Sequence, residues 1–311
     1  MANSITKFKA YIDKLDTVYQ QASATSILDA DADTVRMGAK AGEFLIPKMS
    51  MDGLADYSRS SGYVKGDVTI TYETKSCNYD RGRKFSVDAM DNEETAGIAF
   101  GKLASEFIRT KVVPEMDAFR FAKYASATGV LSAAEATPTA GTAGPTAPPP
   151  PPPPPPAGTA VLTALQTAVN AQDEAEVNVD GKILFITPTL LTLAKNVDTT
   201  KSKAILDRFE KIITVPQTRF YTAIDMKDGT SSNETAGGYA GATGGYKINF
   251  MIINRDAVIQ FGKHTVNKVV SPEENQTDDG YMFFYRAYSI AETYENKEKG
   301  IYLNRDTTAL T

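Results

Sequence analysis

Residues 91–126, DNEETAGIAFGKLASEFIRTKVVPEMDAFRFAKYAS, decide the fold more than any other stretch of the chain. Asp91 is a good helix N-cap, and Glu94 completes a start that resembles a capping box. Apolar residues then recur at helical spacing and mark a buried stripe: Ala96, Phe100, Leu103 and Phe107. Pro114 lies inside the pattern, where it removes a backbone hydrogen bond and should kink or break the helix at a cost of about 3 kcal/mol. The stretch therefore predicts one long bent helix over residues 92–126.

Two extended regions precede this helix. Residues 43–51 indicate an extended segment, and residues 53–88 have the character of a long hairpin. Its clearest strand is 67–73, where apolar and polar residues alternate, and Gly62 and residues 65–67 supply turn chemistry. Both sides of this ribbon carry many polar residues, and an isolated two-stranded ribbon is only marginally stable in water. The pattern therefore favours packing of the ribbon on another chain.

The first residues form an amphipathic pattern. Its apolar positions recur at steps of three and four residues: Ile5, Phe8, Ile12, Leu15 and Tyr19. A helix that covers the protein's own core explains this pattern, and so does an arm that buries its stripe on a neighbouring subunit.

Composition changes sharply over residues 132–159, which are rich in Ala, Thr, Gly and Pro and include an unbroken run of prolines at 148–156. Such a run forms a polyproline II rod or a solvated loop. An SH3 or WW ligand is the functional alternative, but no arginine or lysine flanks the run. Beyond it the chain becomes α/β, with helices at 159–172 and near 190, a glycine-rich loop at 237–245, and strands expected at 183–186, 212–215, 247–254, 265–270, 281–288 and 299–304.

The composition is that of an ordinary globular protein, with 42% hydrophobic and 23% charged residues among 311, and a net charge of −5. This acidic balance argues against a dedicated DNA-binding surface. Cys77 is the single cysteine, so an intrachain disulfide is excluded and a reducing site of synthesis fits. No secretory signal and no apolar run of membrane-spanning length occurs, so we expect a protein made and kept in the cytoplasm, with no membrane partner.

No coherent active site emerges from the sequence. The run Asp29–Asp33 mimics a calcium loop, but Thr34 and Lys40 occupy its glycine and glutamate positions. His264 is the only histidine and lies far from Cys77, which excludes a zinc site or a Cys–His nucleophile within one chain. We therefore expect no catalytic residues, no metal and no cofactor.

Several stretches, in their order and spacing, resemble tailed-bacteriophage major capsid proteins of the HK97 fold over most of the chain. These stretches are residues 44–53 (FLIPKMSMDG), 79–88 (YDRGRKFSVD), 89–95 (AMDNEET), 107–115 (FIRTKVVPE), 285–288 (YRAY) and 295–302 (ENKEKGIY).

The resemblance implies an α+β, HK97-like capsid fold. Its parts would be an N-terminal arm, an extended E-loop hairpin, a long bent spine helix in a peripheral domain and a mixed α/β axial domain. The expected ranges are 1–52 for the N-terminal helix and arm, 53–90 for the E-loop, 91–131 for the peripheral domain with the spine helix, 132–264 for the axial domain including the Pro-rich loop 132–159, and 265–311 for strands that return to the peripheral domain.

The implied function is structural. Copies would form hexamers and pentamers of an icosahedral phage head around double-stranded DNA, which they would meet by non-specific proximity. The protein would assemble in the host bacterial cytoplasm and reside in the virion. The portal protein would be a partner, and because the arm begins at Met1 in place of a scaffolding extension, we expect a separate scaffolding protein. Candidate inter-subunit contacts are all in the predicted ribbon: Tyr63 and Lys65 near its turn, and Asp80, Arg81 and Arg83 as ion-pair partners of a neighbour.

Three other readings stay open. An encapsulin-type bacterial compartment would share the fold but hold enzyme cargo. A cytosolic α/β enzyme would need a convergent polar pocket, and a proline-rich adaptor would use residues 148–156. Some relatives of the family form a lysine–asparagine crosslink, for which Lys65 is a conceivable donor, but no acceptor or catalytic glutamate can be matched and we predict no crosslink.

Overall fold

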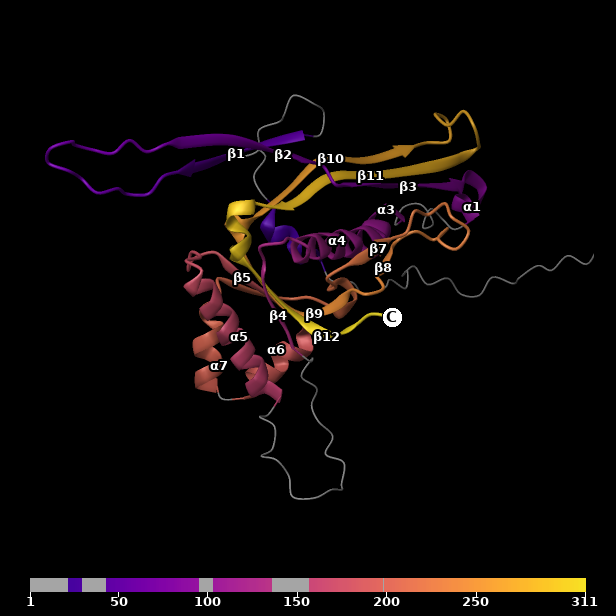
Figure 1. Cartoon of the computed structure of the whole chain (residues 1–311). Helices are drawn as coiled ribbons and strands as arrows, with labels where there is room; N and C mark the ends of the chain where they lie inside the picture. The colour runs from indigo at the N-terminus through magenta and orange to yellow at the C-terminus, as the bar shows by residue number, and fades with distance from the viewer. Residues whose placement is uncertain (1–21, 30–42, 95–102, 136–156, 198) are drawn as a thin grey trace, which may run out of the picture.

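The computed structural model describes residues 22–29, 43–94, 103–135, 157–197 and 199–311, and it is a mixed α+β protein as predicted (Figure 1). A layer of long strands lies above one long helix, and a second sheet with its own helices lies below that helix (Figure 1). The predicted N-terminal helix at 5–19 and the proline run at 148–156 lie outside the described residues. Among the described helices, none is long and apolar enough to cross a membrane.

An antiparallel hairpin projects from one end of the upper layer (Figure 1). Its strands are β1 (Glu43–Met51) and β2 (Val68–Ser76), and their register runs from Glu43 opposite Ser76 to Met51 opposite Val68. The extended segment predicted at 43–51 is therefore confirmed, and it supplies the partner of the predicted strand at 67–73. The hairpin therefore begins at residue 43, ten residues before the start of the ribbon predicted at residue 53.

The second half of the predicted ribbon belongs to another sheet. Strands β3 (Tyr79–Asp88), β10 (Val258–Val270) and β11 (Gly280–Thr293) form a three-stranded antiparallel sheet in the order β10-β11-β3. Asn78 directs the chain into this sheet, because its side-chain amide donates to the carbonyl of Ala291 at 2.8 Å and accepts from the Ala291 N–H at 3.1 Å. The expected single ribbon over 53–88 is wrong for residues 79–88.

The long helix is continuous from Leu103 to Ala125. It consists of α3 (Leu103–Phe107), a π-helical stretch (Ile108–Val112) and α4 (Val113–Ala125). The π stretch explains how Pro114 is tolerated: the Val113 N–H bonds to the Ile108 carbonyl, five residues back, so the helix widens where the proline ring would otherwise meet a carbonyl. Pro114 therefore changes the local winding and does not end the helix.

A separate short helix, α1 (Ala89–Glu94), follows β3, and the connection between α1 and α3 lies outside the described residues. It begins earlier than the predicted start at Asp91, because the Asp88 carboxylate accepts the Met90 N–H at 2.9 Å and acts as the cap.

The lower sheet has five strands in the order β4-β12-β9-β5-β6. Their bounds are Leu131–Ala134, Ile301–Ala309, Tyr246–Asn254, Lys182–Ile186 and Lys211–Thr214, respectively. Three helices cover one face: α5 (Ala157–Glu174), α6 (Pro188–Lys195) and α7 (Thr199–Leu206) (Figure 1). The other face packs on α4, where the Phe121 ring lies 5.2 Å from that of Phe185. Both faces of β5 are thus buried, which explains its uninterrupted apolar sequence.

Two expected assignments change at the C-terminal end. Strand β12 pairs with β4 and β9 in the lower sheet, so residues 301–309 do not return to the sheet of β3. The expected boundary at 264/265 falls inside β10.

The glycine-rich loop expected at 237–245 contains a short strand, β8 (Tyr239–Gly241), which pairs with β7 (Ile224–Met226). The remaining elements are short 3-10 turns at Thr25–Leu28, Gln217–Arg219, Arg255–Ala257 and Glu295–Gly300.

Candidate functional site

The hairpin β1–β2 has one apolar face and one polar face. Residues paired across an antiparallel ladder point to the same side, and alternate residues share a face. The register therefore places six apolar side chains together: Pro47, Met49, Met51, Val68, Ile70 and Tyr72. All six side chains are exposed. For the five other than Pro47, the exposed fraction ranges from 53% for Met49 to 67% for Tyr72. We call this set the apolar face of the hairpin.

The connection between β1 and β2 extends the same character to the tip. Leu54, Tyr57, Tyr63 and Val64 are all highly exposed, and the Tyr57 and Tyr63 rings pack on each other with centroids 4.8 Å apart. A tight turn closes at Gly62, whose φ of +80° is the left-handed conformation that glycine adopts readily. The tip thus presents aromatic surface to solvent within a locally hydrogen-bonded turn.

Such a surface is unusual on a soluble chain. Contiguous exposed apolar patches mark interaction sites, and a two-stranded ribbon without a packed face is marginally stable in water. Among the described residues nothing covers the apolar face of the hairpin, so this face is free to bind another surface.

The base of the hairpin is anchored to the body. Phe44 is 1% exposed and packs with Ile259 of β10 and Ile290 of β11 in the upper sheet. On the polar face, Lys48 forms an ion pair with Glu295 at 2.8 Å. The hydrogen bond from Lys48 lowers the pKa of Glu295, and the same contact raises the pKa of Lys48. The anchor therefore combines burial at one residue with exposed charges, and it holds only the base.

The five residues predicted to contact a neighbour separate into two groups. Tyr63 and Lys65 lie in the turn of the hairpin and are exposed. Asp80, Arg81 and Arg83 lie on β3, because residues 79–88 belong to the upper sheet. The structure brings the two groups to different elements, and contact of any of them with a second subunit stays a prediction.

Asp80, Arg81 and Arg83 have partners within the chain. Asp80 accepts two hydrogen bonds from the Arg286 guanidinium, at 2.8 and 2.6 Å, and this contact lowers the pKa of Asp80. The Arg83 guanidinium donates to the Thr235 carbonyl at 3.0 Å. Their charges are therefore already engaged inside one subunit.

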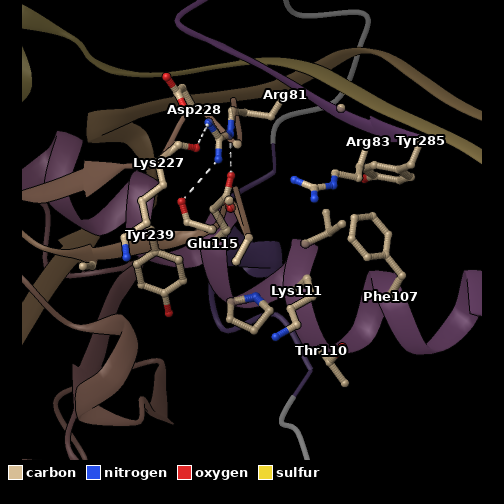
Figure 2. A pocket seen from close by; sticks show the side chains of 18 of the residues that line it. Arg81, Arg83, Phe107, Thr110, Lys111, Glu115, Lys227, Asp228, Tyr239 and Tyr285 are labelled. Atoms are coloured by element: carbon tan, nitrogen blue, oxygen red, sulfur yellow. Dashed lines mark hydrogen bonds and ion pairs between the residues drawn. The ribbon is translucent and has the colours of Figure 1, made fainter. Parts of the chain in front are cut away.

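Arg81 fixes a junction between three elements. Its Nε donates to Glu115 of α4 at 2.8 Å, and its terminal nitrogens donate to the carbonyls of Lys227 and Gly238 at 2.8 and 3.3 Å (Figure 2). Glu115 also accepts from the hydroxyl of Tyr79 at 3.2 Å, and burial raises the pKa of Tyr79. Arg81 thus ties β3 to the long helix and to both ends of the loop between β7 and β8.

A groove of about 1170 Å³ lies between β3, the long helix and the loop between β7 and β8 (Figure 2). Its apolar lining comes mainly from the helix and the upper sheet: Phe85, Leu103, Phe107, Val112, Pro114 and Tyr285. Arg83 and Lys111 line it, and so do Lys227 and Asp228 of the loop. The volume exceeds that of ordinary small-molecule pockets, about 300–1,000 Å³.

A buried polar network holds residues 22–29 against the long helix. The carboxylate of Asp117 is fully buried and accepts hydrogen bonds from the hydroxyl groups of Ser23 and Thr25, at 2.7 and 2.6 Å. Arg219 forms an ion pair with Asp117 at 3.0 Å and donates to the carbonyl of Ala22 at 3.4 Å. These contacts fix residues 22–25 against the long helix and Arg219.

Within the described residues, no group of three or more His, Cys, Asp or Glu side chains is arranged to hold a metal ion. His264 is exposed on β10, and Cys77 is half-buried between β2 and β3. Asp31 and Asp33 of the calcium-like run lie outside the described residues.

Sequence reasoning missed the apolar face, the groove and the network of Asp117. The alternation of Val68, Ile70 and Tyr72 was visible, but its counterpart at Met49 and Met51 becomes meaningful only once β1 and β2 are paired. No local pattern marks Asp117, whose partners lie more than 90 residues away.

The fold is that of HK97-like phage capsid subunits. Solved structures match the chain over nearly its whole length. The mature capsid of bacteriophage PhiM1 matches with a TM-score of 0.64 at 9% identity, covering 98% of this chain and 93% of that chain. The capsid of the cyanophage P-SCSP1u matches with a TM-score of 0.59 at 14% identity, covering 97% and 94%. A virus-like particle from Pyrococcus furiosus matches with a TM-score of 0.50 at 11% identity, covering 90% and 97%.

No protein-family model matches the sequence, and no curated protein matches it. At these identities the structural matches establish the fold and leave the function to be argued from the molecule itself.

Proposed function

We propose that this chain is the major capsid protein of a tailed bacteriophage, which assembles into hexamers and pentamers of an icosahedral head around double-stranded DNA. The observation that carries the proposal is the exposed apolar face of the hairpin on an HK97-like fold. A surface that the described part of the chain leaves uncovered is what a subunit of a closed shell requires.

The parts of the chain take the following roles in this proposal. The hairpin β1–β2 is the E-loop, and the upper sheet with the long helix forms the peripheral domain. The lower sheet, including β12, forms the axial domain with helices α5, α6 and α7. Residues before β1 form the arm. The expected loop 132–159 is shorter than predicted, because β4 extends to Ala134 and α5 begins at Ala157, and the Pro-rich stretch between these two elements is the insertion beside the axial domain.

The hairpin makes the contact between neighbours in this proposal. A head-to-tail contact that closes into a ring joins two different surfaces, so the apolar face of one copy must meet a different surface on the next. Tyr63 and Lys65, at the tip, reach furthest from the body and are proposed contacts. Asp80, Arg81 and Arg83 already make hydrogen bonds within the chain, so a contact of these residues with a neighbour would have to form in addition to those bonds.

The remaining partners follow from the same role. A portal protein would occupy the vertex through which DNA enters, and a separate scaffolding protein would guide assembly in the bacterial cytoplasm. Contact with packaged DNA would be non-specific, which suits a net charge of −5. The mature protein would reside in the virion.

A single pair of variants tests the role of the hairpin. Ile70→Glu places a charge on the apolar face, and Thr71→Glu places the same charge one residue along β2, on the polar face. With the chain expressed alone and together with candidate scaffolding proteins, we expect closed particles in electron micrographs of the unchanged chain and of Thr71→Glu. Ile70→Glu should yield only unassembled subunits, because a buried unpaired charge is costly.

Equal assembly by both variants would show that the apolar face is not an inter-subunit contact. Failure of the unchanged chain to form particles with any scaffolding protein would contradict the capsid function as a whole.

The likeness to the Pyrococcus furiosus particle supports a second candidate, an encapsulin-type compartment. The content of purified particles separates the two. Packaged DNA supports the capsid, and an enzyme cargo without DNA supports the compartment.

A further inference from the structure

We propose that the groove between β3, the long helix and the loop between β7 and β8 is the docking site for residues 5–19 of the same chain. The proposal goes beyond the capsid function and does not depend on it, because it concerns a contact within one subunit.

The position at which the chain enters the body supports this occupant. Arg219 binds the carbonyl of Ala22, and the residue before it, Thr218, lines the groove. Tyr239, which also lines the groove, donates its hydroxyl to the carbonyl of Thr218 at 3.0 Å. Only two residues separate Tyr19 from Ala22, a reach of about 10 Å at most in extended chain. A segment that ends at Tyr19 is therefore within reach of that end of the groove.

The chemistry of the segment matches that of the groove. Ile5, Phe8, Ile12, Leu15 and Tyr19 share one side of a helix at the predicted spacing. A helix over residues 5–19 would be about 22 Å long, and the helical wall of the groove from Leu103 to Glu115 is about 18 Å long at 1.5 Å per residue. An apolar stripe of this length needs an apolar surface of the same length, and the groove offers one among the described residues.

One charged contact at the rim fits the same arrangement, although residues 5–19 as a whole carry Lys7, Lys9 and Lys14 against Asp13 and Asp16. Lys111 and Lys227 both line the groove, and within the described part of the chain neither ammonium group is in an ion pair. Asp16 follows Ile12 by four residues and precedes Tyr19 by three, so it borders the apolar stripe of the segment. An aspartate at this border would face the lysines at the rim.

Disulfide trapping tests the contact. In a Cys77→Ser background, the full chain carries Ile12→Cys on the stripe and Lys111→Cys at the rim of the groove. A disulfide needs Cα atoms about 5.5–6 Å apart, so docking should bring the two thiols within range. The control replaces Ile12→Cys with Thr17→Cys, which lies on the opposite side of the predicted helix. Under a mild oxidant we expect the stripe pair to close within one chain roughly tenfold faster than the control, because docking raises its effective concentration.

Each outcome decides the proposal. A disulfide within one chain that the control does not form supports it. A disulfide between two chains overturns it and assigns the groove to the segment of a second copy. No disulfide, or equal rates for both pairs, also overturns it, and residues 95–102, which precede Leu103 in the sequence, then become the candidate occupant. Because gels resolve these products whether or not shells form, the result is separable from the test of assembly.

A second measurement covers the case in which a cysteine variant fails to fold. Ile12→Glu with Leu15→Glu disrupts the stripe, whereas Ala10→Glu with Thr17→Glu adds the same charge to its other side. Amide hydrogen exchange over residues 103–112 should be faster in the first variant and unchanged in the second, each compared with the unchanged chain. Unchanged exchange in both variants would overturn the proposal.

Discussion

The hairpin β1–β2 and the pair β10–β11 are both long antiparallel ribbons with alternating side chains, but of the two only the second is covered by the described body of the chain. Phe283 and Ala287 of β11 point to the long helix and are buried, and the Tyr285 ring lies 5.9 Å from that of Phe107. Ile70 and Tyr72 of β2 occupy equivalent alternating positions and remain exposed. Alternation alone therefore shows that a strand has an apolar face, and the surroundings decide which molecule covers it.

The largest expected effect separates the two ribbons by their contribution to stability. Phe283→Ala removes a fully buried ring beside Phe85 and Phe107, and should lower the free energy of unfolding by about 3–5 kcal/mol. Ile70→Ala should change it by less than about 0.5 kcal/mol in the unassembled chain, because the side chain is exposed before and after folding. Urea denaturation of unassembled subunits measures both. A large loss in Ile70→Ala would mean that the hairpin packs on its own subunit.

A pair of glycines sharpens the comparison at the level of the backbone. A Cβ at Gly82, in β3, would lie 2.7 Å from the Tyr285 carbonyl oxygen, whereas a Cβ at Gly53, in the turn of the hairpin, meets nothing within 4 Å. Gly82→Ala should destabilise the chain by about 1–3 kcal/mol, as overpacking does. Gly53→Ala should be neutral or stabilise it by up to about 1 kcal/mol through the unfolded state. Thermal unfolding of both variants provides the test, and equal midpoints would contradict the difference in packing.

The smallest expected effect concerns charge on the exposed side of the upper sheet. The hydrogen bonds from Arg286 lower the pKa of Asp80, so the pair contributes stability above the unfolded-state pKa and loses it as pH falls through the folded-state pKa. The contribution is therefore lost below about pH 4, near the ordinary pKa of aspartate. In Arg286→Ala the pKa of Asp80 should return toward its ordinary value, as NMR titration of the carboxyl carbon would measure. An unchanged pKa would show that the ion pair does not persist in solution.

Much of the fold could be predicted because the local spacing of apolar residues indicates helices and strands. Leu103 and Phe107 of the predicted helical stripe pack against the core, and the apolar run in β5 is fully buried, as their local patterns indicate. The alternation in β2 predicts a strand with one apolar face, and that face is exposed. Pairing was harder to predict, because it depends on contacts between distant residues. Residues 79–88 look like a continuation of the hairpin until Asn78 binds Ala291, more than 200 positions away. The C-terminal strand likewise joins the lower sheet through partners that no local signal identifies.

The residues that the sequence singled out are not those of the apolar face, and whether any of them contacts a neighbour stays a prediction. Charges near the hairpin drew attention to Asp80, Arg81 and Arg83, which bind within the chain. The apolar residues of β1 received less weight, because the sequence does not show that Met49 lies opposite Ile70. A charge in a sequence does not reveal whether its partner lies in the same molecule, and the tertiary structure supplies that answer.

The apolar face of the hairpin also limits how much free protein a cell can hold. Until another surface covers it, each newly made copy exposes an apolar surface through which it can aggregate with other copies. The mutual repulsion of chains with a net charge of −5 slows such encounters but does not remove that surface. Aggregation of free copies should therefore increase with their concentration, and the yield of unassembled protein should fall on strong overexpression.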